Sequence, residues 1–294
     1  MGRPVARFGA TFTACVVIVV AALPAVGLAS ELIGRNAANV TLRVDAAGKA
    51  LVTFRSAGQS KTVVAWGAVD ARPPDRARPQ VAFTIVLGGG IGPNVCRPYR
   101  GPPIAWRVAA CTAPDGTHWA VQAWQRTLPN YGAAASGDRA AWELRLAHWS
   151  GDLPKLELWT DWSYRRFEHL YGRLTYKGLP VFGFRSSRYG VPLDAYGRNV
   201  YVDALDSDYG AGWKRVNSFL AHNPRGTFCY GFYPHGGRGT GAGRRYRATV
   251  IGPGVAPDVM WEGPGAGSFD AERDAAANAR QHALLAGDRL CKIN

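Results

Sequence analysis

Acidic and aromatic residues that could act on a glycan lie on two neighbouring segments of this chain. The segments are 142–149, WELRLAHW, and 155–164, KLELWTDWSY, with the five residues SGDLP between them. Alternation of apolar and polar residues is typical of β-strands, and a short break rich in Gly and Asp is typical of a hairpin turn. We therefore expect an antiparallel hairpin in which Trp149 lies opposite Lys155.

This register predicts one sheet face that is polar yet carries tryptophans. Glu143 would lie opposite Asp161, with Cβ atoms ~5 Å apart. A retaining glycosidase needs two carboxyls about 5 Å apart, and aromatic rings give a sugar a stacking surface. The predicted ligand-binding residues are Trp149, Trp159 and Arg145, and the carboxylates of a catalytic alternative are Glu143, Glu157 and Asp161.

Two structural explanations that involve no ligand compete with a glycan site on this face. The arginines could simply neutralise the acids, and the tryptophans could pack beneath a loop. A one-residue slip in register would also move every side chain to the other face. No G-x-S-x-G, H-E-x-x-H or P-loop motif is present. We therefore favour non-catalytic binding, keep a glycoside hydrolase as the alternative, and keep a structural protein without a ligand as a third possibility.

The acids of a second stretch, VYVDALDSDYGAGWKR at 200–215, are explained as strand and turn residues. Asp203 falls on a predicted strand, whereas Asp206 and Asp208 fall among turn-forming residues. An EF-hand template laid on Asp206 and Asp208 requires Gly where Ala211 stands and Glu where Asn217 stands. We expect no metal and no cofactor. Asp206 and Asp208 stay weak candidates for an irregular cation loop, and Asp203 and Asp206 are reserve carboxylates for the enzyme alternative.

The N-terminal segment has the pattern of a secretory signal peptide. Arg3 and Arg7 precede the apolar run VVIVVAAL at 16–23, and Gly27-Leu28-Ala29 supplies small residues before Ser30. This order predicts cleavage after Ala29. The alternative is an uncleaved membrane anchor, because the apolar stretch 8–29 is marginally long enough to span a bilayer. We expect a secreted, extracellular or envelope-associated protein.

The charge of the chain favours an anionic partner. The formal net charge is +14, and an excess of cations outside a cell suits an acidic envelope polymer or polysaccharide. A merely soluble basic surface explains the same excess. Nucleic acid is not expected, because the basic residues are dispersed and form no recognisable motif. No stretch after residue 29 approaches the ~20 apolar residues of a membrane helix, and the oligomeric state stays open.

Four cysteines remain after the predicted cleavage, an even number that indicates disulfides in an oxidising compartment. Three connectivities are possible. We favour Cys96 with Cys111, which closes a short loop, and Cys229 with Cys291, which would tie the C-terminal tail to the body. No C-x-x-C pair is present, so a zinc site is not expected.

Many short alternating segments predict a mainly antiparallel β fold, a sandwich or jelly-roll-like body with a C-terminal α-helix. The helix is expected at 271–285, capped by Ser268 or Asp270, and 167–171 is expected to form a short helical turn. The predicted strands are 40–44, 50–55, 62–68, 81–87, 104–109, 119–125, 142–149, 155–164, 173–176, 181–185, 200–204, 227–233 and 246–251. The predicted units are a signal peptide at 1–29, a β unit at 30–69, a Pro/Arg-rich linker or loop at 70–80, the main β domain at 81–267, and a helix with a disulfide-anchored tail at 268–294.

Overall fold

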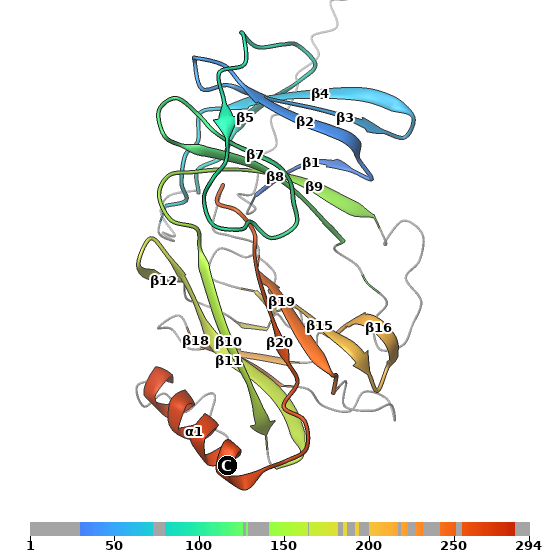
Figure 1. Cartoon of the computed structure of the whole chain (residues 1–294), viewed down its shortest axis with the longest axis vertical. Helices are drawn as coiled ribbons and strands as arrows, with labels where there is room; N and C mark the ends of the chain where they lie inside the picture. The colour runs from blue at the N-terminus through green and yellow to red at the C-terminus, as the bar shows by residue number, and fades with distance from the viewer. Residues whose placement is uncertain are drawn as a thin grey trace, which may run out of the picture.

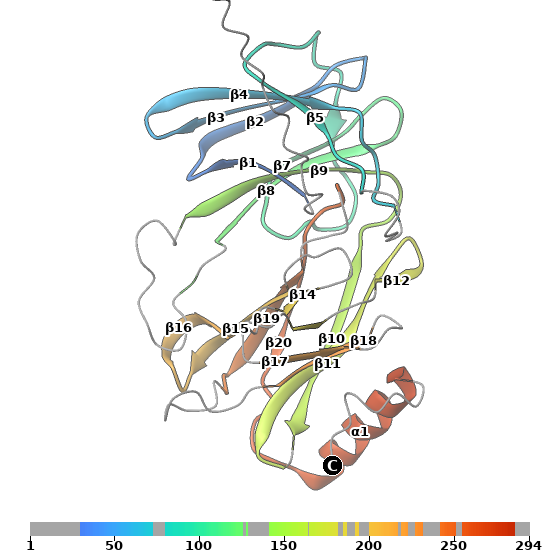
Figure 2. The same ribbon diagram turned by 180° about the vertical axis from the view of Figure 1, so that it is seen from behind.

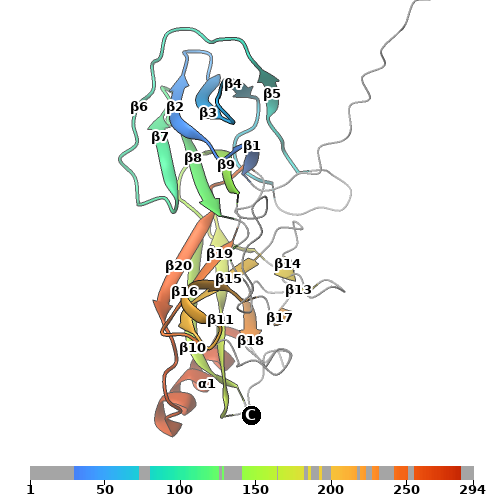
Figure 3. The same cartoon turned by 90° about the vertical axis from the view of Figure 1, so that its right-hand side faces the viewer.

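The computed structural model confirms a mainly antiparallel β protein with a C-terminal helix. It describes residues 30–72, 80–125, 128, 141–163, 165–181, 185–186, 192–193, 200–216, 219–222, 227–231, 242–250 and 255–285. These residues form two bodies stacked along the long axis of the molecule (Figures 1 and 3). We call residues 30–149 the N-terminal sandwich and residues 155–285 the C-terminal sandwich.

Two antiparallel sheets build the N-terminal sandwich. The sheet nearer the C-terminal sandwich, which Figure 2 shows from behind, has the order β1-β9-β8-β7-β6. Its strands are β1 (Glu31–Arg35), β9 (Trp142–Trp149), β8 (His118–Gln125), β7 (Arg107–Thr112) and β6 (Arg97–Pro98). The outer sheet runs in chain order through β2 (Ala38–Val44), β3 (Ala50–Ser56), β4 (Gln59–Trp66) and β5 (Thr84–Leu87).

Apolar side chains from both sheets share one core in this sandwich. Val52 and Phe54 of β3 belong to the same buried cluster as Trp119 of β8 and Leu144 and Leu146 of β9. The period-two alternation of these strands sends every second residue inward, which is why the sequence pattern located them.

Two further sheets build the C-terminal sandwich. One has the order β10-β11-β18-β17, with β12 beside β11, and the other has the order β16-β15-β19-β20. The strands of the first are β10 (Lys155–Ser163), β11 (Phe167–Tyr176), β12 (Leu179–Val181), β18 (Thr227–Gly231) and β17 (Phe219–His222). The second comprises β15 (Val200–Ser207), β16 (Gly210–Arg215), β19 (Arg245–Val250) and β20 (Val259–Pro264), and β13 (Arg185–Ser186) pairs separately with β14 (Pro192–Leu193). Leu158, Leu170, Val202 and Ala248 lie in one core cluster shared by the two sheets.

Helix α1 (Ala271–Leu285) packs against β10 and β11 on the side away from that core (Figure 1). The carboxylate Oδ1 of Asp270 accepts the backbone N–H of Arg273 at 2.8 Å. This is the N-cap that the sequence predicts, with Asp270 rather than Ser268 in the role.

The strands group differently from the units expected from sequence. Strand β5 pairs with β4, so the segment 70–80 connects neighbours within one sheet and does not separate two cores. The change of sandwich comes instead at 150–154. Residues 167–171 form the first half of β11 and not a helical turn, because all of them pair with β10 and those from His169 onward also pair with β18.

One of the two expected disulfides is confirmed. Cys96 and Cys111 are bonded, with Cα atoms 5.8 Å apart, and Cys111 is buried in the N-terminal core. The expected pair of Cys229 with Cys291 lies outside the part of the chain whose side chains the structure describes.

Candidate functional site

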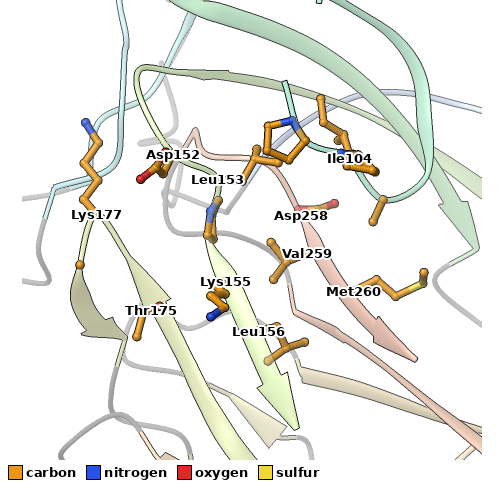
Figure 4. Close-up of a pocket in the computed structure, with 15 residues that line it drawn as sticks. Ile104, Asp152, Leu153, Lys155, Leu156, Thr175, Lys177, Asp258, Val259 and Met260 are labelled. Carbon is orange, nitrogen blue, oxygen red and sulfur yellow. The ribbon is translucent and has the colours of Figure 1, made fainter. Parts of the chain in front are cut away.

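A groove of about 510 Å³ lies where the two sandwiches meet (Figure 4). Three parts of the chain line it: the loop 102–105 of the N-terminal sandwich, the connector 152–154, and the C-terminal sandwich at 155–156, 175, 177–178 and 258–260. Because these segments are far apart in the sequence, the groove exists only when the two sandwiches are docked.

The floor of the groove is aliphatic. Figure 4 shows Ile104, Leu156, Val259 and Met260 around the opening. Prolines 102, 103 and 154 and Leu153 complete the apolar lining, and none of the lining residues is aromatic. This part of the lining suits apolar groups, and the groove offers no ring on which a sugar could stack.

Two lysines and two acids line the groove, and each lysine also pairs with an acid outside the lining. Lys155 Nζ lies 2.9 Å from Glu157 Oε1, and Lys177 Nζ lies 2.5 Å from Asp70 Oδ2. Asp152 and Asp258 also line the groove, so its formal charge balances. The charge at the groove therefore does not select an anionic ligand.

Asp70 connects both sandwiches beside this rim. Its carboxylate accepts hydrogen bonds from Ser150 Oγ at 2.6 Å and Tyr176 Oη at 2.9 Å, in addition to Lys177. Burial alone would raise the pKa of Asp70, but the hydrogen bonds from Lys177, Ser150 and Tyr176 outweigh it and lower the pKa below 3.8.

A serine and a lysine close together can form a nucleophile and its base, but the Asp70 cluster has the wrong proton arrangement. Lys177 Nζ lies 3.2 Å from Ser150 Oγ, yet Ser150 donates its hydroxyl proton to Asp70. With its proton directed at Asp70, the Ser150 hydroxyl has none to give to the Lys177 nitrogen, which itself donates to Ser150 Oγ. The cluster holds the sandwiches together, and its geometry does not activate Ser150.

The prediction of a hairpin between 142–149 and 155–164 is wrong. Strand β9 is paired on one edge with β1 and on the other with β8, whereas β10 pairs with β11. The connector SGDLP carries the chain from one sandwich to the other and does not reverse it. Glu143 lies opposite Arg35 and Trp124, and Asp161 lies opposite His169, so the expected carboxylate pair does not form.

The expected binding residues of β9 are inside the molecule. Trp149 is 0% exposed, and Glu143 and Arg145 are each 3% exposed. Arg145 Nη2 lies 2.9 Å from Glu143 Oε2, so the two buried charges pair with each other. These three residues have no surface on which a polymer could bind.

The expected residues of β10 share one face, which α1 covers in part. Glu157 pairs with Lys155 and with Arg173, and these hydrogen bonds lower the pKa of Glu157. The ring of Trp159 stacks on Tyr171 with centroids 5.7 Å apart, and the Arg280 guanidinium of α1 lies 5.7 Å from the Trp159 ring. Asp161 is fully buried.

Asp161 has acidic and basic neighbours that the sequence did not reveal. Burial raises the pKa of Asp161 to about 7, the Trp162 amide opposes this, and the Asp274 carboxyl on α1 raises it further. His169, directly opposite on β11, is also buried, and burial lowers its pKa to about 4. Asp161 Oδ2 and both ring nitrogens of His169 are buried without a hydrogen-bond partner among the described residues. The carboxyl groups of Asp161 and Asp274 therefore lie close together between β10 and α1.

Asp203 and Asp206 are held by arginines, whereas the backbone N–H of Asp208 donates to Ala242 O. Asp203 is buried and pairs with Arg215 and with Arg247, whose guanidinium lies 4.2 Å from the Trp213 ring. Asp206 is exposed and pairs with Arg244 at 2.9 Å. Within the described residues, no three acidic, histidine or cysteine side chains are grouped as a metal site requires.

Comparison with protein-family models, with curated proteins and with solved structures gives no match for this chain. No helix in the described part of the chain has the length and apolar character needed to cross a membrane.

Proposed function

We propose that the protein is exported and acts outside the cytoplasm, free or attached to the cell envelope. The signal-like order of basic, apolar and small residues at 1–29 supports export. The Cys96–Cys111 disulfide supports it as well, since such bonds persist mainly in oxidising compartments.

In this proposal the protein is a non-catalytic binding protein whose ligand occupies the groove between the two sandwiches. The aliphatic lining of the 510 Å³ groove carries the proposal. The expected tryptophan face does not support polysaccharide as the ligand, because Trp149 and Arg145 are buried and Trp159 lies under Arg280. The ligand class that fits the lining is an extended peptide segment with apolar side chains.

Strand edges beside the groove support a peptide over an aliphatic chain. Lys155 and Leu156 begin β10, and Val259 and Met260 begin β20. Each strand is the last of its sheet within the described residues, and the two strands lie close to each other without pairing as β partners. Such an edge offers backbone N–H and C=O groups to an extended peptide, while pockets take alternate side chains.

The test is binding of an immobilised library of ten-residue peptides, with an acidic polysaccharide array in parallel. We expect alternating apolar peptides to bind. Met260→Glu should weaken binding at least ~10-fold, because it puts a charge in the apolar floor. Leu87→Glu is the matched control, since Leu87 is 80% exposed on β5 and lies outside the groove.

Equal losses in the two variants would contradict the groove as the binding site. Binding of the polysaccharide alone would contradict a peptide ligand. Binding of neither would favour a structural role without a ligand.

A further inference from the structure

The outer sheet of the N-terminal sandwich has one face that points away from the core. Its register places Arg43 opposite Leu51, and Leu51 opposite Val64. These residues alternate along their strands with residues of the core cluster, to which none of the three belongs. The sheet is also the outermost layer of strands (Figures 1 and 3), so this row faces away from the rest of the molecule.

Three threonines form the next row of this face. Thr41 lies opposite Thr53, and Thr53 lies opposite Thr62. The hydroxyl groups of Thr41 and Thr53 are hydrogen-bonded at 2.6 Å. Since each hydroxyl can donate and accept, the row offers hydrogen bonds of the kind that sugar hydroxyls make.

On the other side of the Arg43 row lies an aromatic ring with a cation beside it. Trp66 follows Val64 by two residues on β4, so it points to the same side, and it is half-buried. Lys49 Nζ lies 5.0 Å from the centre of the Trp66 ring. An aromatic ring gives a sugar a stacking surface. The flexible stem of Lys49 lets its ammonium turn from the ring towards an anionic group of a ligand.

Three cations of this face have no acidic partner among the described residues. Arg43 and Arg55 are exposed, Lys49 is half-buried, and none of them forms an ion pair with a described acid. Asp45, which follows β2, is 7% exposed, and its carboxylate accepts hydrogen bonds from three backbone N–H groups at 3.0 to 3.2 Å. The face therefore carries an excess of positive charge.

The arginines on the second sheet of the C-terminal sandwich differ in this respect, because acids already bind them. Arg215 and Arg247 pair with Asp203, Arg244 pairs with Asp206, and Arg245 pairs with Glu262. The cations of the outer sheet are therefore better placed than these to bind an anionic partner.

We propose that this outward face binds an acidic polysaccharide, with the ring of Trp66 stacked on a sugar and with Arg43, Lys49 and Arg55 paired with carboxylate groups along the polymer. Lys49 and Arg55 are six residues apart in an extended chain, a span of about 20 Å. One sugar cannot bridge that span, so the ligand is a chain of several sugars. The site is separate from the groove, and it rests on the proposed export only for the place where the polymer is met.

A polysaccharide fits this face better than a lipid surface does. The apolar residues at the centre of the face, Leu51 and Val64, are each 6% exposed. A membrane-binding surface instead presents apolar side chains that enter the boundary of the bilayer.

The first test is isothermal titration calorimetry of the purified protein with polygalacturonate. Dextran serves as an uncharged polysaccharide, and polyglutamate serves as a polyanion without sugars. We expect polygalacturonate to bind most tightly, and added salt to weaken its binding, because the cations are exposed. Equal affinities for polygalacturonate and polyglutamate would overturn the proposal, and so would binding to phosphatidylglycerol vesicles without binding to polygalacturonate.

The second test places the ligand on the outward face. Arg43→Glu should weaken polygalacturonate binding at least ~10-fold, because it sets a like charge against the polymer. Arg97→Glu is the matched control, since Arg97 is exposed on β6 in the other sheet of the same sandwich and its replacement changes the net charge equally. Equal losses in the two variants would overturn the outward face as the site.

The role of the ring is tested by replacing Trp66. Trp66→Ala should weaken binding of polygalacturonate about fivefold and leave binding of polyglutamate unchanged, because only a sugar stacks on the ring. Trp66→Phe keeps a ring and should restore part of the lost affinity. Equal losses for both polymers in Trp66→Ala would contradict stacking.

The groove and the outward face can fail independently. Met260→Glu should leave polygalacturonate binding unchanged, because Met260 lines the groove. Arg43→Glu should leave peptide binding unchanged. Loss of polygalacturonate binding in Met260→Glu would overturn a separate site, whereas absence of peptide binding would contradict only the proposed function.

Discussion

Asp161 shows how little a residue's identity reveals about its role. The sequence places this carboxylate on a polar strand face, and the structure buries it beside the half-buried Asp274 of α1. Asp161 could be chosen from the sequence because strand alternation is local. Asp274 could not, because it lies in the first turn of α1, where an acid is expected anyway for the helix dipole.

Asp161→Asn should change how stability depends on pH. The pKa of Asp161 is raised from 3.8 to about 7 in the folded chain, so the native protein loses stability as pH rises between those values. The amide cannot ionise, and the variant should be more stable than the native chain above pH 8 by about 2 kcal/mol. The advantage should vanish towards pH 4.

Thermal unfolding of both chains from pH 4 to pH 9 measures this effect. The control is Glu157→Gln, because the pKa of Glu157 is lowered by Lys155 and Arg173 and its contribution has the opposite sign. An Asp161→Asn variant whose stability differs from that of the native chain by the same amount at every pH would contradict a raised pKa for Asp161.

At the scale of elements, strand positions followed from the sequence and strand pairing did not. The segments 142–149 and 155–163 form strands with almost the expected bounds. Their pairing depends on β1, β8 and β11, which compete for the same edges and lie elsewhere in the chain. The turn-like connector therefore does not determine which strands pair, because it fits a hairpin and a crossing between sandwiches equally well. The groove could not be predicted from the sequence either, because it combines distant segments between residues 102 and 260.

Helix α1 should depend strongly on its N-cap. Replacing Asp270 with Ala removes the acceptor for the Arg273 amide and should cost about 1 kcal/mol of helix stability. Hydrogen exchange of the α1 amides should become faster, while exchange in β3 and β8 should stay unchanged. Glu272→Gln is the control, because Glu272 is exposed in the first turn and should change the rates far less. Equal acceleration in both variants would contradict a capping role for Asp270.

At the scale of the whole molecule, the two sandwiches are coupled by polar contacts as well as apolar ones. Asp70 joins Ser150 to Tyr176 and Lys177, and Trp124 packs on Tyr201 with ring centroids 5.0 Å apart. Relative motion of two bodies is the default unless their interface is extensive. These contacts therefore fix the width of the groove.

Asp70→Asn should loosen this coupling. The variant loses the ion pair with Lys177 and should be destabilised by about 1–2 kcal/mol at pH 7. The pKa of Asp70 is lowered in the folded chain, so its contribution is present above 3.8 and is lost as pH falls through the lowered value. Small-angle scattering should show a larger radius of gyration for the variant, with Asp115→Asn, a loop acid of the N-terminal sandwich, as the control.

Gln122 and His148 also bear on how the chain folds as it is made. Gln122 binds both backbone groups of Asp258, 136 positions later, and the His148 amide donates to Val255 O. Synthesis proceeds from the N-terminus, so the first sandwich is complete before residues 255–258 are made. Its side of the seam between the two sandwiches has no partner until then. Closure of so distant a contact is slow compared with local pairing. While the rest of the chain is being synthesised, the first sandwich therefore exposes the surface that later forms the seam. A holdase chaperone has access to that surface during this interval.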